Sequence, residues 1–222
     1  AATIDQPLSA GPGMKIDFVS DVACPWCAVG LYSLERALDR LGDSVPVEIR
    51  FQPFELNPDM PPEGEETVPY LAKKYGTSAE EIAQRREFIR QRGAAVGFTF
   101  GERPHVWNTF DAHRLLHWAA LEGRQRELKR ALLIAYHTNA ENPSAPEVLL
   151  RAAGEIGLDV DRARAILDSD EYADDVRERQ RFYRQLGINS VPSMIIDDRH
   201  LIQGGQPPEV IEQTLRQLAA ES

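Results

Sequence analysis

The chain has 222 residues, of which 42% are hydrophobic and 27% charged, a composition typical of a folded globular protein and not of a disordered one. Its formal net charge of -10 argues against a nucleic-acid partner, because phosphate binding needs a concentrated basic face. No stretch approaches the roughly 20 apolar residues that a membrane-spanning helix needs, so we expect no membrane partner.

The first predicted unit is a β-α-β segment. Residues 15–20 alternate apolar and polar side chains, which predicts a strand, and residues 45–51 alternate in the same way. Between them, leucines recur at steps of three and four residues up to Gly42, which predicts a helix that ends there. These leucines are Leu31, Leu34, Leu38 and Leu41.

A proline-rich connection at residues 53–69 leads into a long helical stretch. Ser78 with Glu81, and again Ser144 with Glu147, have the spacing of a capping box at the start of a helix. Further helices, with the glycines that end two of them, are predicted at residues 108–121 (Gly123), 125–136 and 171–186 (Gly187).

The two-residue period returns near the C-terminus. Residues 193–196 and 200–203 predict a hairpin, and Pro207 with Pro208 begins a final helix. The order β-α-β, helical insertion, β-β-α predicts a split α/β domain. The predicted parts are an α/β domain (residues 14–56 and 187–222), an all-helical insertion (residues 57–186) and a flexible N-terminal leader (residues 1–13).

The only two cysteines, Cys24 and Cys27, stand three positions apart at the predicted start of the first helix. Residues at this spacing are neighbours on a helix, so the two sulfurs can form a small disulfide while Cys24 faces solvent. Free N–H groups and the helix dipole favour the thiolate of Cys24. We therefore expect Cys24 to attack a disulfide and Cys27 to resolve the resulting mixed disulfide.

Two other interpretations of the cysteine pair are less favoured. A purely structural disulfide across so short a loop removes little chain entropy. A zinc site needs four ligands, so His113 and His117, four positions apart on one helix, would have to complete it from far away in the sequence. We predict no metal.

Five stretches in order carry a resemblance to a known family: FVSDVACPWCAVG (18–30), PFELNPDMPPEG (53–64), DAHRLLH (111–117), SVPSMII (190–196) and GGQPPEV (204–210). They resemble the DsbA-like branch of the thioredoxin superfamily and, within it, the FrnE-like proteins. These are similar to kappa-class glutathione transferases and 2-hydroxychromene-2-carboxylate isomerases. The resemblance implies a thioredoxin-like α/β fold with a large all-helical insertion, and protein disulfide oxidoreductase activity.

The resemblance also implies further site residues. Val191 and Pro192 would form the family's cis-proline loop, and Pro25 and Trp26 would contact substrate. A buried carboxylate often accepts the proton of the resolving cysteine in this superfamily, and either Asp21 or Glu55 could serve. The residues placed near the cleft, with helix capping or interior packing as the alternative, are Asn108, Thr109, His113 and Arg114.

The leading functional hypothesis is a thiol-disulfide oxidoreductase acting on protein or small-molecule thiols and disulfides. One alternative is a glutathione-dependent transferase or isomerase acting on an aromatic small molecule. Another is a chaperone-like binding module without turnover. We expect no bound cofactor, glutathione as the candidate redox partner, and a cytoplasmic location because residues 1–13 lack the pattern of a secretory signal. The sequence gives no indication of oligomeric state.

Overall fold

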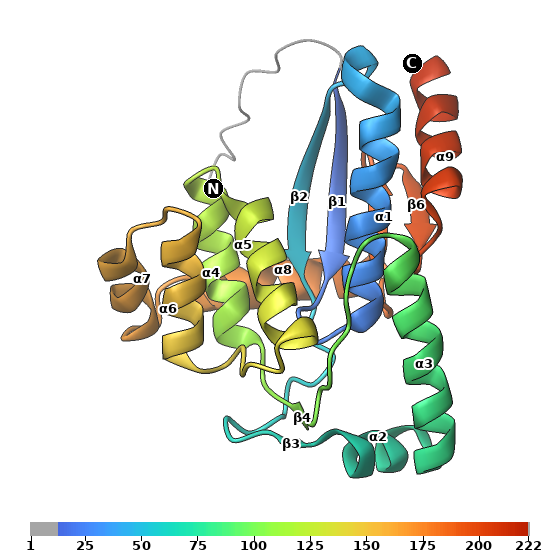
Figure 1. The fold of residues 1–222 in the computed structure, drawn as a ribbon. Helices are drawn as coiled ribbons and strands as arrows, with labels where there is room; N and C mark the ends of the chain where they lie inside the picture. Colours follow the sequence, from blue (N-terminus) through green and yellow to red (C-terminus); the bar gives the residue numbers. More distant parts are fainter. Residues whose placement is uncertain (1–12, 222) are drawn as a thin grey trace.

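The computed structural model describes residues 13–221 (Figure 1). The predicted leader therefore lies outside the described residues, except for Gly13. The strands are β1 (Met14–Ser20), β2 (Val47–Pro53), β3 (Glu65–Glu66), β4 (His105–Val106), β5 (Ser193–Ile196) and β6 (His200–Gln203). The helices are α1 (Pro25–Leu41), α2 (Thr67–Tyr75), α3 (Ala79–Ala95), α4 (Phe110–Leu121), α5 (Gln125–Leu133), α6 (Pro146–Glu155), α7 (Val160–Leu167), α8 (Ala173–Gln185) and α9 (Pro208–Ala220).

The central sheet has the strand order β2-β1-β5-β6. β1 pairs parallel with β2 and antiparallel with β5, and β5 and β6 form the predicted hairpin. Asp197 and Asp198 have φ values of 51° and 57°, the left-handed conformation, at the centre of a turn in which the N–H of Arg199 donates to the carbonyl of Ile196. The predicted order β-α-β, insertion, β-β-α is confirmed.

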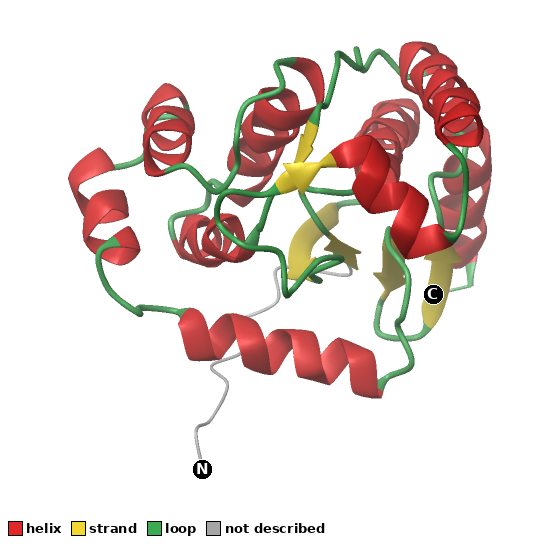
Figure 2. Ribbon diagram, turned by 90° about the horizontal axis from the view of Figure 1, so that it is seen from below, coloured by secondary structure: helices red, strands yellow, loops and turns green. Residues whose placement is uncertain are grey.

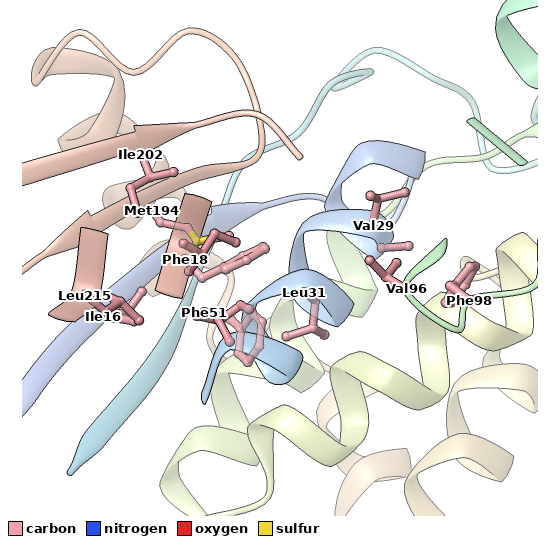
Figure 3. Close-up of a cluster of buried hydrophobic side chains, with 14 of the residues drawn as sticks. Ile16, Phe18, Val29, Leu31, Phe51, Val96, Phe98, Met194, Ile202 and Leu215 are labelled. Atoms are coloured by element: carbon pink, nitrogen blue, oxygen red, sulfur yellow. The ribbon is translucent and has the colours of Figure 1, made fainter. Parts of the chain in front are cut away.

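The main core lies between the sheet and α1, with α9 packed beside α1 (Figure 1). Phe18 on β1 pairs with Phe51 on β2, and their ring centroids are 5.4 Å apart. Val96 and Phe98, from the segment after α3, belong to the same cluster (Figure 3). The helical part of the chain and the sheet therefore share one core.

Helices α4 to α8 form a second layer beside β2, whereas α3 packs against α1 (Figure 1). Their apolar faces meet in a separate cluster that includes Leu115, Trp118, Leu128 and Leu149, while α8 packs along β2. Viewed from below, helices lie on several sides of the central strands (Figure 2). Within residues 13–221, no helix is both long and apolar enough to cross a membrane.

Three details of the helical part differ from the sequence prediction. The two-residue strands β3 and β4 interrupt it, and a π-helical turn, Ile134–Thr138, follows α5 where a regular helix was predicted. Ser78 does cap α3 by accepting a hydrogen bond from the N–H of Glu81. The second predicted capping box is wrong: the N-cap of α6 is Ala145, one residue after Ser144, because Pro146 suits the first position of the helix.

Candidate active site

The cysteine pair lies where β1 passes into α1. Cys24 is the N-cap residue of α1, with extended backbone, and Pro25 occupies the first turn, where its missing N–H leaves nothing unpaired. Cys27 lies within that turn and is fully buried. The expectation that Cys24 faces solvent needs correction, because this residue is only 4% exposed. It opens instead onto a cavity.

A loop from the far end of the chain closes over the pair. The Val191–Pro192 peptide bond is cis, as expected. The Sγ atom of Cys24 lies 3.7 Å from the carbonyl oxygen of Val191, within reach of a weak S–H hydrogen bond. Pro192 packs on Gly30 of α1 so closely that a Cβ atom at Gly30 would be 3.1 Å from the Cγ of Pro192.

The cavity beside Cys24 has a volume of about 400 Å³. Pro25, Trp26 and Val191, three of the predicted substrate-contacting residues, line it. Trp26 is half-buried, as expected, and its ring packs against Phe88 with the centroids 5.8 Å apart. Much of the remaining wall comes from α2, α3 and the segment before β4, so the helical part of the chain encloses Cys24.

Asp21 is fully buried just before the cysteine pair. Its Oδ1 accepts hydrogen bonds from Thr109 Oγ1 at 2.6 Å and His113 Nε2 at 3.2 Å, and its Oδ2 accepts one from the Leu56 N–H at 2.8 Å. Burial alone would raise the pKa of Asp21, but the hydrogen bond and charge of His113, with the other two donors, hold it below its ordinary value. The carboxylate is thus ionised and anchored by three separate segments.

Glu55, the other candidate carboxylate, is engaged elsewhere. Its Oε2 accepts a hydrogen bond from Gln180 Nε2 at 2.9 Å, and its N–H donates to Gln180 Oε1 at 3.0 Å. Of the two, Asp21 is the one beside the cysteine pair.

The predicted cleft residues on and before α4 do not line the cavity beside Cys24. Thr109 and His113 are buried on Asp21, and Asn108 donates to the carbonyl of Met60 and borders a different depression. Arg114 is buried against carbonyl groups in the last turn of α7 and in the segment after it. Thr109 and His113 therefore support the site through Asp21, which matches the interior-packing alternative for His113.

Lys129 is a buried cation behind the pair that the sequence analysis missed. It is 1% exposed, and its Nζ lies 5.8 Å from the centroid of the Phe51 ring. Burial lowers the pKa of Lys129, while the charges of Cys27, Asp21 and Cys24 act to raise it. Burial and the neighbouring Cys24 raise the pKa of Cys27 well above its ordinary value, which leaves Cys27 a thiol at neutral pH.

Arg103 and His137 form a second missed group on the cavity side. His137 Nε2 donates to the carbonyl of Val22 at 2.6 Å, in the loop that leads to Cys24, and Arg103 donates to His137 Nδ1 at 3.4 Å. Burial and the charge of Arg103 lower the pKa of His137 well below its ordinary value, so the imidazole is neutral. His137 therefore connects Arg103 to the loop that precedes Cys24.

The sequence held a signal for only one of these residues. Lys129 follows Leu128 and precedes Leu132 and Leu133 on the apolar face of α5, so a charged residue stands within a buried stripe. Arg103 lies in an irregular segment and His137 in the π-helical turn, where no periodic pattern exists.

A metal centre receives no support from the described residues. Within residues 13–221 there is no group of three or more His, Cys, Asp or Glu side chains that could hold a metal ion. His113 bonds to Asp21, and His117 packs on Tyr172 with the ring centroids 5.0 Å apart.

A cysteine pair at the start of the first helix, opposite a cis-proline loop, on this sheet order, is the arrangement of the thioredoxin-like class. A model of the DSBA-like thioredoxin domain matches residues 15–216. The chain belongs to this family.

Individual relatives agree with this assignment. The crystal structure of a probable DsbA oxidoreductase from Streptomyces coelicolor is 34% identical, with a TM-score of 0.85, and the match covers 94% of this chain and 91% of that one. The uncharacterised protein YwbO of Bacillus subtilis (strain 168) is 27% identical over 205 residues, 91% of this chain and 96% of that protein. A 2-hydroxychromene-2-carboxylate isomerase, 13% identical, shares the fold with a TM-score of 0.72 over 93% of this chain and 97% of its own.

Membership of this family supports thiol-disulfide oxidoreductase activity on thiol or disulfide substrates.

Proposed function

We propose that the protein is a disulfide oxidoreductase in which Cys24 is the nucleophile and Cys27 the resolving thiol of the CPWC motif. The observation that carries this proposal is the unequal setting of the two sulfurs. Cys24 lines the cavity at the N-terminus of α1, whereas Cys27 is fully buried behind it. Only Cys24 is therefore placed to meet a substrate.

The exchange has two steps. The Cys24 thiolate attacks a substrate disulfide, so that a Cys24–substrate disulfide forms and one substrate thiolate leaves. Cys27 then loses its proton and attacks Cys24, which forms the Cys24–Cys27 disulfide and releases the second substrate thiolate. The substrate disulfide is reduced, the protein pair is oxidised, and the reverse sequence oxidises a dithiol.

Val191 is the proposed contact for a peptide substrate. Its carbonyl oxygen lies beside Cys24, at the edge of the cavity. A peptide that pairs with this backbone in an extended conformation would bring its own sulfur to Cys24.

Glutathione as redox partner and a cytoplasmic location complete the proposal. Equilibration of the cysteine pair in glutathione buffers measures the reduction potential and tests the first. Cell fractionation tests the second.

A trapping experiment tests the assigned roles. Cys27→Ser should accumulate covalent mixed disulfides with substrates, whereas Cys24→Ser should form few or none. Non-reducing gels followed by mass spectrometry read the result. Adducts of equal abundance in both variants would overturn the assignment.

Insulin reduction separates this proposal from the alternatives. A glutathione-dependent isomerase needs no resolving thiol and should keep its activity in Cys27→Ser, while disulfide reductase activity should be lost. A binding module would suppress aggregation in a light-scattering assay with no insulin reduction by the wild type.

A further inference from the structure

Two guanidinium groups in the wall of the cavity have no anionic partner. Arg103 is 9% exposed, and its Nε has no hydrogen-bond partner. Arg86, on α3, donates from Nη2 to the carbonyl oxygen of Arg103 at 2.8 Å, and its buried Nε is also without a partner. Among the salt bridges of residues 13–221, neither arginine takes part.

An unpaired buried arginine is an unfavourable arrangement. The guanidinium group stays charged in proteins, and a buried charge is costly unless an opposite charge compensates it. Burial and the like charge of Arg86 both lower the pKa of Arg103, whereas the charge of Cys24 acts to raise it. The cavity is therefore electrostatically prepared to receive an anion close to Cys24.

The geometry points to a carboxylate. We propose that Arg103 and Arg86 form a carboxylate-binding site in the cavity beside Cys24, and that the protein thereby selects small thiols and disulfides that carry a carboxylate group. A guanidinium presents paired N–H donors that match the two oxygens of a carboxylate. The volume of about 400 Å³ suits a small organic molecule.

The rest of the cavity fits the apolar part of such a molecule. Trp26, Leu71, Ile89 and Tyr136 contribute apolar or aromatic surface to the wall. A ligand can therefore place its sulfur at Cys24, its carbon chain on these side chains and its carboxylate on the arginines. This inference rests on the proposed disulfide exchange, whose atoms and electrons it leaves unchanged.

The first test compares two disulfides that differ in charge. Reduced protein is mixed with dithiodipropionate, which carries carboxylates, or with hydroxyethyl disulfide, which is neutral, and the loss of the protein's own two thiols in a single turnover is followed by mass spectrometry of acid-quenched samples. Arg103→Gln should lower the ratio of the two rate constants about ten- to a hundredfold, the usual effect of losing a charge-assisted hydrogen bond. Arg103→Lys, which keeps the charge but not the paired donors, should lower it less.

Matched variants separate binding from general charge effects. Arg86→Gln should lower the ratio in the same direction, which also provides a second test if Arg103→Gln does not fold. Arg90→Gln removes a cation from the same helix outside the cavity, where Arg90 pairs with Glu87, and should leave the ratio unchanged. Equal slowing of both disulfides in Arg103→Gln and in Arg86→Gln would overturn the carboxylate site.

A second measurement does not depend on redox activity. Iodoacetate and iodoacetamide both form a thioether with Cys24 and release iodide, but only iodoacetate carries a carboxylate. The ratio of the iodoacetate rate constant to the iodoacetamide rate constant should be higher in the wild type than in Arg103→Gln. The difference should be about ten- to a hundredfold, as for the two disulfides. If the wild type reduces neither disulfide but keeps this preference, the proposed function fails and the anion site stands. If it reduces both without preference, and the two alkylation ratios are equal, the anion site fails and the function stands.

Discussion

The sulfur of Cys24 lies 3.7 Å from the carbonyl oxygen of Val191, a residue 167 positions further along the chain. A thiol can donate a hydrogen bond to this oxygen, whereas a thiolate cannot. The contact therefore holds the reduced, protonated cysteine against the loop. Loss of the proton would remove this bond.

The unequal burial of the two sulfurs predicts selective alkylation. Iodoacetamide at neutral pH should modify Cys24 and leave Cys27 unmodified, because Cys27 is fully buried and burial raises its pKa. Peptide mass mapping of the native protein identifies the labelled residue. Unfolding in denaturant should make both cysteines react, and equal labelling in the native state would contradict the predicted difference.

The raised pKa of Cys27 predicts a resolving step that accelerates with pH. Below that pKa the thiolate fraction rises about tenfold for each pH unit, so the mixed disulfide on Cys24 should decay correspondingly faster between pH 6 and 8. In the mixed disulfide, the Cys24 thiol no longer contributes to the pKa of Cys27. Burial, the largest cause, still raises that pKa. A rate that does not change with pH would show that another step limits the decay.

Substitution of Lys129 provides a second test of this pH dependence. Its charge acts to lower the pKa of Cys27, so Lys129→Met should move the profile to higher pH and slow the decay at pH 7. Lys73→Met removes an exposed lysine from α2 and should leave the profile unchanged.

Asp21→Asn should destabilise the protein by about 1.5–3 kcal/mol, the usual contribution of a hydrogen bond to a charged group. An amide offers a single acceptor oxygen, so its NH₂ group would face either the Leu56 N–H or the donors on Thr109 and His113. Urea unfolding measures the difference. Asp39→Asn, on the exposed face of α1, should change stability by less than about 0.5 kcal/mol.

The pH dependence of this difference has a defined sign. The folded-state pKa of Asp21 is lowered, so its stabilising effect is fully present above the unfolded pKa of about 3.9 and is lost as pH falls through the folded pKa. The wild type and Asp21→Asn should therefore differ above pH 5 and converge as pH falls below 4. A difference that persists undiminished at the lowest pH would contradict the lowered pKa of Asp21.

Gly30→Ala should reduce activity more than stability. The added Cβ would lie 3.1 Å from the Cγ of Pro192, so the loop must shift by a few tenths of an ångström away from Cys24. Insulin reduction should slow several-fold, while the melting temperature changes little because alanine favours the helix by up to about 1 kcal/mol. Gly154→Ala, where a Cβ would lie 3.1 Å from Val160 far from the site, should leave activity intact.

Local patterns were sufficient to predict the scaffold and the cysteine pair. Alternation in residues 15–20 and the leucine spacing in α1 reflect contacts within a single element, and they predicted β1, α1 and the position of Cys24. Strands β3 and β4 were not predicted because each has only two residues. Each is defined only by its pairing with the other, in which Glu65 lies opposite Val106.

The rest of the site depends on contacts between distant segments. Arg103 belongs to the cavity because the connection before β4 passes beside Cys24, and His137 reaches Val22 from a π-helical turn. The family resemblance correctly predicted that Thr109 and His113 lie near the cysteine pair, but they contact Asp21 and do not line the cavity. Their side-chain directions depend on how α4 packs.

The three donors on Asp21 also determine how this protein can be engineered. Thr109 and His113 belong to the helical part of the chain, and Leu56 to the connection that precedes it. Excision of that part to obtain a minimal thioredoxin-sized module would leave a bare carboxylate beneath the reactive loop. A viable deletion must therefore replace Asp21 with an uncharged residue in the same design, and a transplanted CPWC loop must carry its carboxylate and donors together.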